Sequence, residues 1–169
     1  MPAVRHFTAT AFVVHDGHLA LHWHLKVKAW LPPGGHIDEN EDPVQAVLRE
    51  TEEETGLKTA IVPTGPVFDL AYPDHVPPPL TIMIEDIHDP VQGYHQHIDM
   101  IYVSRPVGAP GELNDGWVWT SRDDLANGAT IDHDSGPSVP PPEDVRILAR
   151  HAFDLVDGLR RRARRIVWM

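Results

Sequence analysis

Acidic side chains crowd into one short stretch of this sequence. Eight of them lie between Asp38 and Glu54, within the run GHIDENEDPVQAVLRETEEETGL. At the period of an α-helix, Glu50, Glu53 and Glu54 share an arc of about 100° on one face. Glu52 points away from that arc. Three carboxylates on one face, in a chain without cysteine, form a donor set suited to a hard cation such as Mg²⁺ or Mn²⁺.

A solvated acidic face is the alternative to a metal site, since most Glu-rich helices carry one. Two features favour the metal site. Glu50 and Glu54 are like charges one helical turn apart, which destabilises a helix unless a positive group intervenes, and Arg49 is the nearby basic residue. The helix also follows a Pro-Pro-Gly-Gly turn, whose free backbone groups can face the same spot.

A helix over residues 43–55 is predicted to position these carboxylates. Asp42 is a good N-cap, and Gln45 completes a capping box with it. Pro43 suits the first helical position, and Gly56 ends the helix. The preceding segment, residues 29–41, is predicted to be a loop, because its prolines and paired glycines preclude regular structure.

The remaining pattern predicts a sheet with a second long helix. Apolar alternation around the turn Asp16-Gly17 indicates a hairpin. The chain ends in a predicted amphipathic helix over residues 143–158. The other predicted elements are strands at 59–70, 80–87, 98–105 and 116–120, a helical turn at 122–125 and a loop at 127–142. Their mixed order indicates the α+β class, as an α/β/α sandwich around a mixed β-sheet.

The acidic stretch resembles the signature box of the Nudix hydrolases, G-x5-E-x7-R-E-U-x-E-E-x-G-U, in which U is a bulky apolar residue. The fixed letters are matched by Gly35, Glu41, Arg49, Glu50, Glu53, Glu54 and Gly56. Thr51 stands where the pattern has an apolar residue, and its methyl group is expected to pack in the core. The lead-in WLPPGG and the later GWVWTSRDDL also resemble segments of that family.

The resemblance implies a Nudix-type α/β/α sandwich that hydrolyses the pyrophosphate bond of a nucleoside diphosphate linked to another group. Mg²⁺ or Mn²⁺ would be the cofactor. The implied metal ligands are Glu50, Glu53, Glu54 and the backbone carbonyl near Gly35. Arg49 would hold Glu41 and orient the cluster.

The resemblance also implies a general base, which takes the proton of the attacking water. In similar enzymes the base is a box glutamate or an acidic residue near the Trp-bearing strand. Glu53 is the first choice here, Glu112 the second, and Asp115 follows.

Four residues outside the box are candidates for substrate binding. His36 follows the paired glycines and is placed to touch a phosphate, and Lys28 lies in the loop before them. Trp30 could stack on a base, with packing as its alternative. Asp99 shares one face of a strand with His97, where it either lines a substrate cleft or is satisfied in the core.

Twelve histidines raise the alternative of a zinc protein. The pairs His22/His24 and His95/His97 each place two rings on one face of a strand. No cysteine and no HExxH motif accompanies them, so we expect surface or cleft histidines rather than zinc ligands.

The whole chain of 169 residues is predicted to hold one Nudix-type hydrolase domain, residues 1–159, and a basic C-terminal tail, residues 160–169. Residues 1–159 hold 9 basic and 25 acidic side chains, a net charge of −16. Such a body repels polyanions, so nucleic acid is an unlikely partner, whereas a small nucleotide diphosphate substrate with a metal ion suits it. The tail is expected to be the solvated end of the last helix.

The cellular setting is predicted from apolar runs. None approaches the roughly 20 residues of a membrane span, and the start of the chain has no long apolar region. We therefore expect a cytoplasmic protein without membrane contact, and a homodimer is left open.

Two other functions compete with a pyrophosphatase. A non-catalytic Nudix-fold sensor would bind a nucleotide without turnover, but a complete set of box carboxylates favours the enzyme. A His-rich zinc buffer would take up metal even after loss of the box glutamates.

Overall fold

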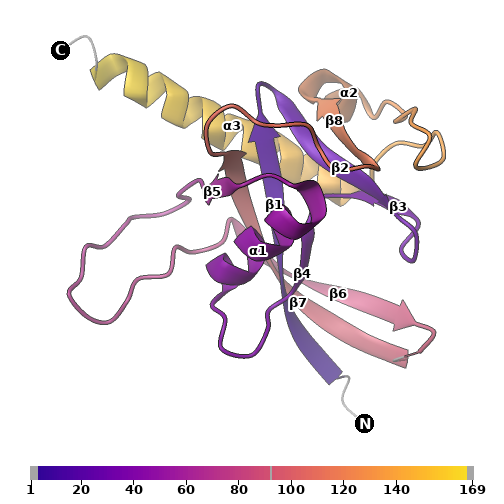
Figure 1. Ribbon diagram of the computed structural model, residues 1–169, viewed down its shortest axis with the longest axis horizontal. Coiled ribbons are helices and arrows are strands. Elements are labelled where there is room, and N and C mark those ends of the chain that lie inside the picture. Colours follow the sequence, from indigo (N-terminus) through magenta and orange to yellow (C-terminus); the bar gives the residue numbers. More distant parts are fainter. Residues whose placement is uncertain (1–3, 92, 167–169) are drawn as a thin grey trace.

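The computed structural model describes residues 4–91 and 93–166, which form three layers around a mixed β-sheet. Figure 1 shows helix α1 (Pro43–Thr55) in front of the strands and helix α3 (Glu143–Ile166) behind them. The apolar side chains form two clusters, one beneath each helix. This arrangement is the predicted α/β/α sandwich.

Strand β1 (Val4–His15) lies at the centre of the sheet. It pairs in parallel with β7 (Gly93–Pro106) over ten residues and forms the predicted hairpin with β2 (His18–His24). The pairing of β1 with β7 is parallel and all other strand pairs within the described residues are antiparallel, which makes the sheet mixed. The other strands are β3 (Ala29–Leu31), β4 (Gly34–His36), β5 (Thr59–Ile61), β6 (Thr81–Asp89) and β8 (Trp117–Ser121).

The second half of β1 is apolar on both faces because both faces are covered. Side chains alternate along a strand, so Ala9 and Ala11 lie under α1 whereas Phe12 and Val14 lie under α3. Small alanines on the α1 side let that helix approach the sheet closely. Position on β1 therefore decides which helix a residue faces.

Helix α1 has the predicted bounds, and its caps explain them. The Asp42 side chain accepts hydrogen bonds from the Val44 and Gln45 backbone N–H groups, at 2.7 and 2.9 Å. The Gln45 side chain in turn accepts from the Asp42 N–H at 2.9 Å. Gly56 ends the helix in the left-handed conformation, with φ 76°. Thr51 is fully buried, as expected, and its hydroxyl donates to the Val47 carbonyl.

The prediction of a loop without regular structure over residues 29–41 was wrong. Strands β3 and β4 both lie in it, separated by Pro32 and Pro33. The glycines explain the pairing of β4 with β1, because a Cβ atom on Gly34 would lie 2.7 Å from the Ala9 carbonyl oxygen. The missing side chain thus permits a strand where local propensity predicts none.

Other strands differ from prediction in length. The strand predicted over residues 59–70 ends at Ile61, where a segment containing Pro63 and Pro66 begins. Strands β6 and β7 are both longer than predicted, because each extends along the other as far as Asp89 and Gly93.

The last helix extends eight residues beyond its predicted end, to Ile166. Its buried face includes Val145, Ala149 and Phe153. The predicted basic tail therefore begins as helix; residues 167–169 and the side chains of residues 162–166 lie outside the described part. The boundary at residue 159 stays a prediction.

Short helix α2 (Arg122–Asn127) packs beside α3. The Arg122 guanidinium donates to the Asp157 carboxylate at 2.8 Å and lies 4.7 Å from the centre of the Phe153 ring. Within the described residues, no helix combines the length and the apolar character that crossing a membrane requires.

Candidate active site

Arg49 lies beside the acidic face of α1 and contacts several of its carboxylates. Its Nε and Nη2 atoms donate to the two carboxylate oxygens of Glu41, at 2.8 and 2.9 Å. Its Nη1 atom donates to Glu50 at 2.8 Å and to Glu53 at 3.4 Å. The hydrogen bonds from Arg49 lower the pKa of Glu41. One guanidinium group therefore orients three of the predicted site carboxylates.

Arg49 also fixes the loop that leads from β4 to α1. Its Nη2 atom donates to the His36 carbonyl at 3.2 Å and lies 3.7 Å from a carboxylate oxygen of Asp38. The helix and the loop that precedes it thus share one charged centre.

The paired glycines bring the backbone of β4 against the other side of the carboxylates. The Gly34 N–H donates to a carboxylate oxygen of Glu54 at 3.1 Å. A Cβ atom on Gly35 would lie 2.5 Å from the Glu50 carboxylate, so any side chain there would displace that group. The glycines of β4 and the acidic face of α1 therefore lie against each other, as the sequence predicts.

Negative charge is concentrated where they meet. Burial raises the pKa of Glu54 to about 7; the Gly34 N–H opposes that rise, and the charges of Glu50 and Glu53 add to it. Glu50, Glu53 and Glu54 offer only oxygen donors, so the donor set fits Mg²⁺ or Mn²⁺.

Asn114 ties a distant loop to the end of α1. Its side-chain amide donates to the Glu54 carbonyl at 3.0 Å, and its backbone N–H donates to the Thr55 carbonyl at 3.0 Å. Sequence reasoning missed Asn114, because an asparagine in a loop carries no distinctive spacing. Its neighbours Glu112 and Asp115 are both exposed. Glu112 forms no hydrogen bond or ion pair with any described residue, and its role stays a prediction.

Trp30 is fully buried and cannot stack on a substrate base. It packs in the core, which was the alternative. Its ring is fully buried, meets Trp23 edge-on and donates from Nε1 to the Pro137 carbonyl at 3.3 Å. Lys28 is exposed in the turn between β2 and β3 and, in the described part of the chain, forms no salt bridge. Its role stays a prediction.

Asp99 lies on the α3 side of the sheet, away from α1. It is buried and accepts hydrogen bonds from the hydroxyls of Thr8 and Thr10, at 2.9 and 2.8 Å. Burial raises the pKa of Asp99, and the two hydroxyls oppose the rise. The carboxylate is therefore satisfied within the sheet, and a contact with substrate stays a prediction.

Sequence reasoning also missed Glu85, which pairs across from His97 on the neighbouring strand β6. Burial raises the pKa of Glu85 to about 7, and the charges of Asp99 and Asp144 add to the rise. The α3 side of the sheet therefore carries a second polar region.

His36 stands between these two polar regions. Its carbonyl belongs to the Arg49 network, but its exposed ring lies next to His6, with Nε2 and Nδ1 of the two rings 3.2 Å apart. Burial and the charge of His6 lower the pKa of His36, and Glu50 acts in the opposite direction. Phosphate contact by this ring stays a prediction.

Comparison with known proteins points to one family. A family model described as the NUDIX domain matches residues 4–140. The crystal structure of a NUDIX family hydrolase from Clostridium perfringens is 30% identical, has a TM-score of 0.70, and is matched over 90% of this chain and 98% of that chain.

Curated relatives match over shorter segments. A bis(5'-nucleosyl)-tetraphosphatase (asymmetrical) from Rattus norvegicus is 48% identical over 31 residues, which are 18% of this chain and 21% of that protein. An m7GpppN-mRNA hydrolase, NUDT17, from Xenopus laevis is 55% identical over 29 residues, 17% of this chain and 10% of that protein. The matches thus span about a fifth or less of these relatives.

Proposed function

We propose, because this chain belongs to the NUDIX family, that it hydrolyses a pyrophosphate bond in a nucleoside diphosphate linked to another group. Mg²⁺ or Mn²⁺ would be the cofactor. The observation that carries the proposal is the close contact of the Glu50 and Glu54 carboxylates with Gly34 and Gly35 of β4. Ligand oxygen atoms from both a helix and a strand therefore lie close together.

The carboxylates of Glu50, Glu53 and Glu54 and the carbonyl of Gly35 are the groups that would hold the cation. A divalent cation held there would neutralise charge on the phosphates and would lower the pKa of an attacking water. The chain itself keeps the carboxylates in place, since Arg49 bonds Glu50 and Glu53 from one side and Gly34 bonds Glu54 from the other.

Exposure favours Glu53 as the general base that takes the proton of the attacking water. Its side chain is 61% exposed, whereas those of Glu41 and Glu50 are 21% and 19% exposed. A base must reach a water molecule, and Glu53 is held by one long contact to Arg49. Glu112 is the second candidate for the base.

A substrate panel tests the proposed function. Nucleoside diphosphate derivatives would be incubated with the full chain and Mg²⁺ or Mn²⁺, and the products identified by mass. The panel includes a bis(5'-nucleosyl) tetraphosphate and an m7G-capped RNA, because relatives matched in part are named for acting on such compounds. We expect cleavage at a phosphoric anhydride bond. Tight nucleotide binding without turnover across the panel would instead indicate a sensor.

A pair of matched variants on α1 tests the assignment of Glu53 as the general base. Glu53→Gln should lower kcat at least about 100-fold, the usual contribution of a general base. Glu52→Gln makes the same change on the opposite face of the helix, where Glu52 lies 3.6 Å from Lys58, and should leave kcat unchanged. Full activity in Glu53→Gln would contradict the assignment, and a larger loss in Glu112→Gln would move the base to that residue. Cytoplasmic location and a homodimer stay predictions.

A further inference from the structure

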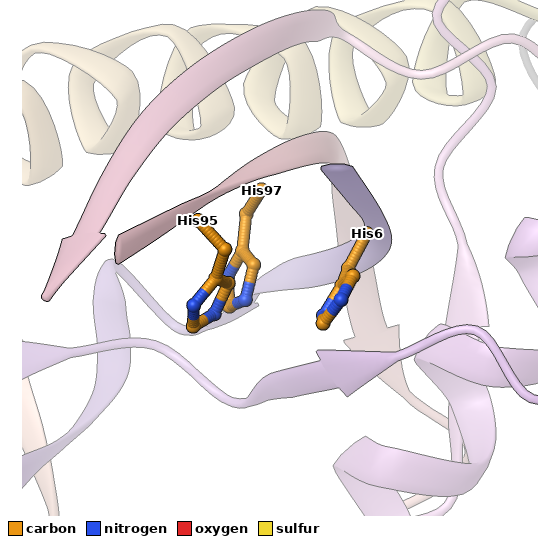
Figure 2. A group of neighbouring side chains, drawn as sticks. All are labelled: His6, His95 and His97. Carbon is orange, nitrogen blue, oxygen red and sulfur yellow. The ribbon is translucent and has the colours of Figure 1, made fainter. Parts of the chain in front are cut away.

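Four histidines from three strands gather on the side of the sheet that faces away from α1. His6 on β1 pairs directly across from His97 on β7, and His95 lies two residues before His97 on the same face. Figure 2 shows the rings of His6, His95 and His97 extending into one shared space. Each offers a ligand atom, and these atoms all lie within 4.8 Å of one another.

Two of the rings are prepared to act as ligands. The Nδ1 atom of His95 lies 3.1 Å from the Gly93 carbonyl, which can only accept, so in the neutral ring Nδ1 carries the proton and Nε2 has the free lone pair. Metal-binding histidines are commonly oriented by such a bond from the other ring nitrogen. The Nε2 atom of His97 is buried and has no hydrogen-bond partner among the described residues. A buried polar atom in that state requires an explanation.

We propose that His6, His95 and His97 bind one Zn²⁺ ion, with His36 as a fourth ligand from β4. Neutral imidazole is a preferred donor for zinc, and three or four of them suit its tetrahedral geometry. Nitrogens around tetrahedral zinc lie about 3.4 Å apart, so the rings would close by roughly an ångström. His36 is within reach, since its Nε2 is 3.2 Å from His6 Nδ1.

This site is separate from the carboxylates of the proposed active site. Its donors are imidazoles and theirs are oxygens, which select different classes of cation. The inference therefore does not depend on the proposed hydrolase activity. The sequence argued against zinc because no cysteine and no HExxH motif accompanies the histidine pairs. His6 joins His95 and His97 only through the parallel pairing of β1 with β7.

Titration of the full chain with ZnCl2 in a calorimeter tests the proposal. We expect the wild type to bind one Zn²⁺ ion, and His95→Gln/His97→Gln to lower the affinity at least about 100-fold, more than loss of an outer ligand partner costs. His22→Gln/His24→Gln is the matched control, because it removes an equally spaced pair from β2, and it should leave the affinity unchanged. Circular dichroism checks the fold of each variant.

Two further experiments distinguish the histidine site from the box glutamates and from a loss of folding. Glu50→Gln/Glu53→Gln/Glu54→Gln should bind Zn²⁺ as the wild type does, which separates this site from the box glutamates. His6→Gln, at a half-buried ring, replaces the double variant if that variant does not fold. Bound Co²⁺ should give the visible absorption of a tetrahedral site in the wild type and lose it in His6→Gln. Zinc binding that vanishes with the glutamates, or that matches between the wild type and the histidine variants, would overturn the proposal.

Discussion

At the scale of single residues, Arg49 is the group on which three site carboxylates depend. It binds Glu41 through two nitrogens and Glu50 and Glu53 through the third. A lysine carries the same charge but lacks the planar fork. We predict that Arg49→Lys lowers kcat/KM about 10- to 100-fold, the range seen when a partner of metal ligands is lost. Steady-state kinetics on the substrate found in the panel measures it.

A double-mutant cycle with Glu41 checks that explanation. Because Glu41 acts through Arg49, Glu41→Gln combined with Arg49→Lys should cost little more than the larger single effect. Additive losses would show that the two residues act independently and would contradict the arrangement described above.

A second prediction for a single residue concerns Gly35 and the affinity of the site for metal. Its absent side chain leaves room for the Glu50 carboxylate, which a Cβ atom would approach to 2.5 Å. Gly35→Ala should therefore raise the Mg²⁺ concentration needed for half-maximal activity at least about 10-fold. Gly158→Ala on α3 is the control, because a Cβ atom there meets nothing within 4 Å. Equal metal dependence in the two variants would contradict the prediction.

The sequence predicted residues whose partners are near in the chain and missed those whose partners are distant. Glu50, Glu53 and Glu54 follow from helical periodicity alone. Burial of Trp30 and the contact of Asn114 with α1 depend on segments more than 55 residues away, Pro137 and Glu54. Local patterns contain no information on such contacts.

At the scale of elements, the N-cap of α1 controls the position of the acidic face. The Asp42 side chain accepts from two backbone N–H groups. Asp42→Ala should lower the free energy of unfolding by about 1 kcal/mol, measured by urea denaturation. Asp42→Asn keeps an equally good cap and should retain most of that stability. If both variants lose the same amount, the negative charge rather than the cap is responsible.

The bounds of α1 were predictable and strand β4 was not, for a physical reason. The ends of α1 are set by Asp42, Pro43 and Gly56 within the element itself. Strand β4 exists because β1 supplies its hydrogen-bond partners, and propensity alone gives Gly34 and Gly35 no strand. Pairing is a property of two segments, so a reading of one segment misses it.

At the scale of the whole molecule, the half-buried His22 predicts how the free energy of unfolding depends on pH. The ring of His22 stacks on Trp117 with centres 4.3 Å apart. Burial, and then the charge of His24, lowers the pKa of His22 from 6.5 to about 4. The unfolded chain therefore binds a proton more readily than the folded chain. The stability that His22 contributes is fully present above pH 6.5 and is lost as the pH falls toward 4.

Comparison with a neutral side chain isolates this contribution. Between pH 7 and pH 4 the wild type should lose on the order of 2 kcal/mol more stability than His22→Gln, because each unit of pKa shift is worth about 1.4 kcal/mol and partial exposure reduces the total. Urea denaturation at several pH values measures both proteins. If the free energy of unfolding of the two proteins changed with pH by the same amount, the prediction would be contradicted.

Strand β1 faces α1 with one set of side chains and α3 with the other, so its contacts depend on the exact number of residues in the strand. It places Ala9 under α1, Phe12 under α3 and His6 among the imidazoles. A one-residue insertion within it would invert every side chain on one side of the new position. Protein engineering by insertion or circular permutation should therefore fail in β1 and succeed at residues 66–74, which are exposed throughout.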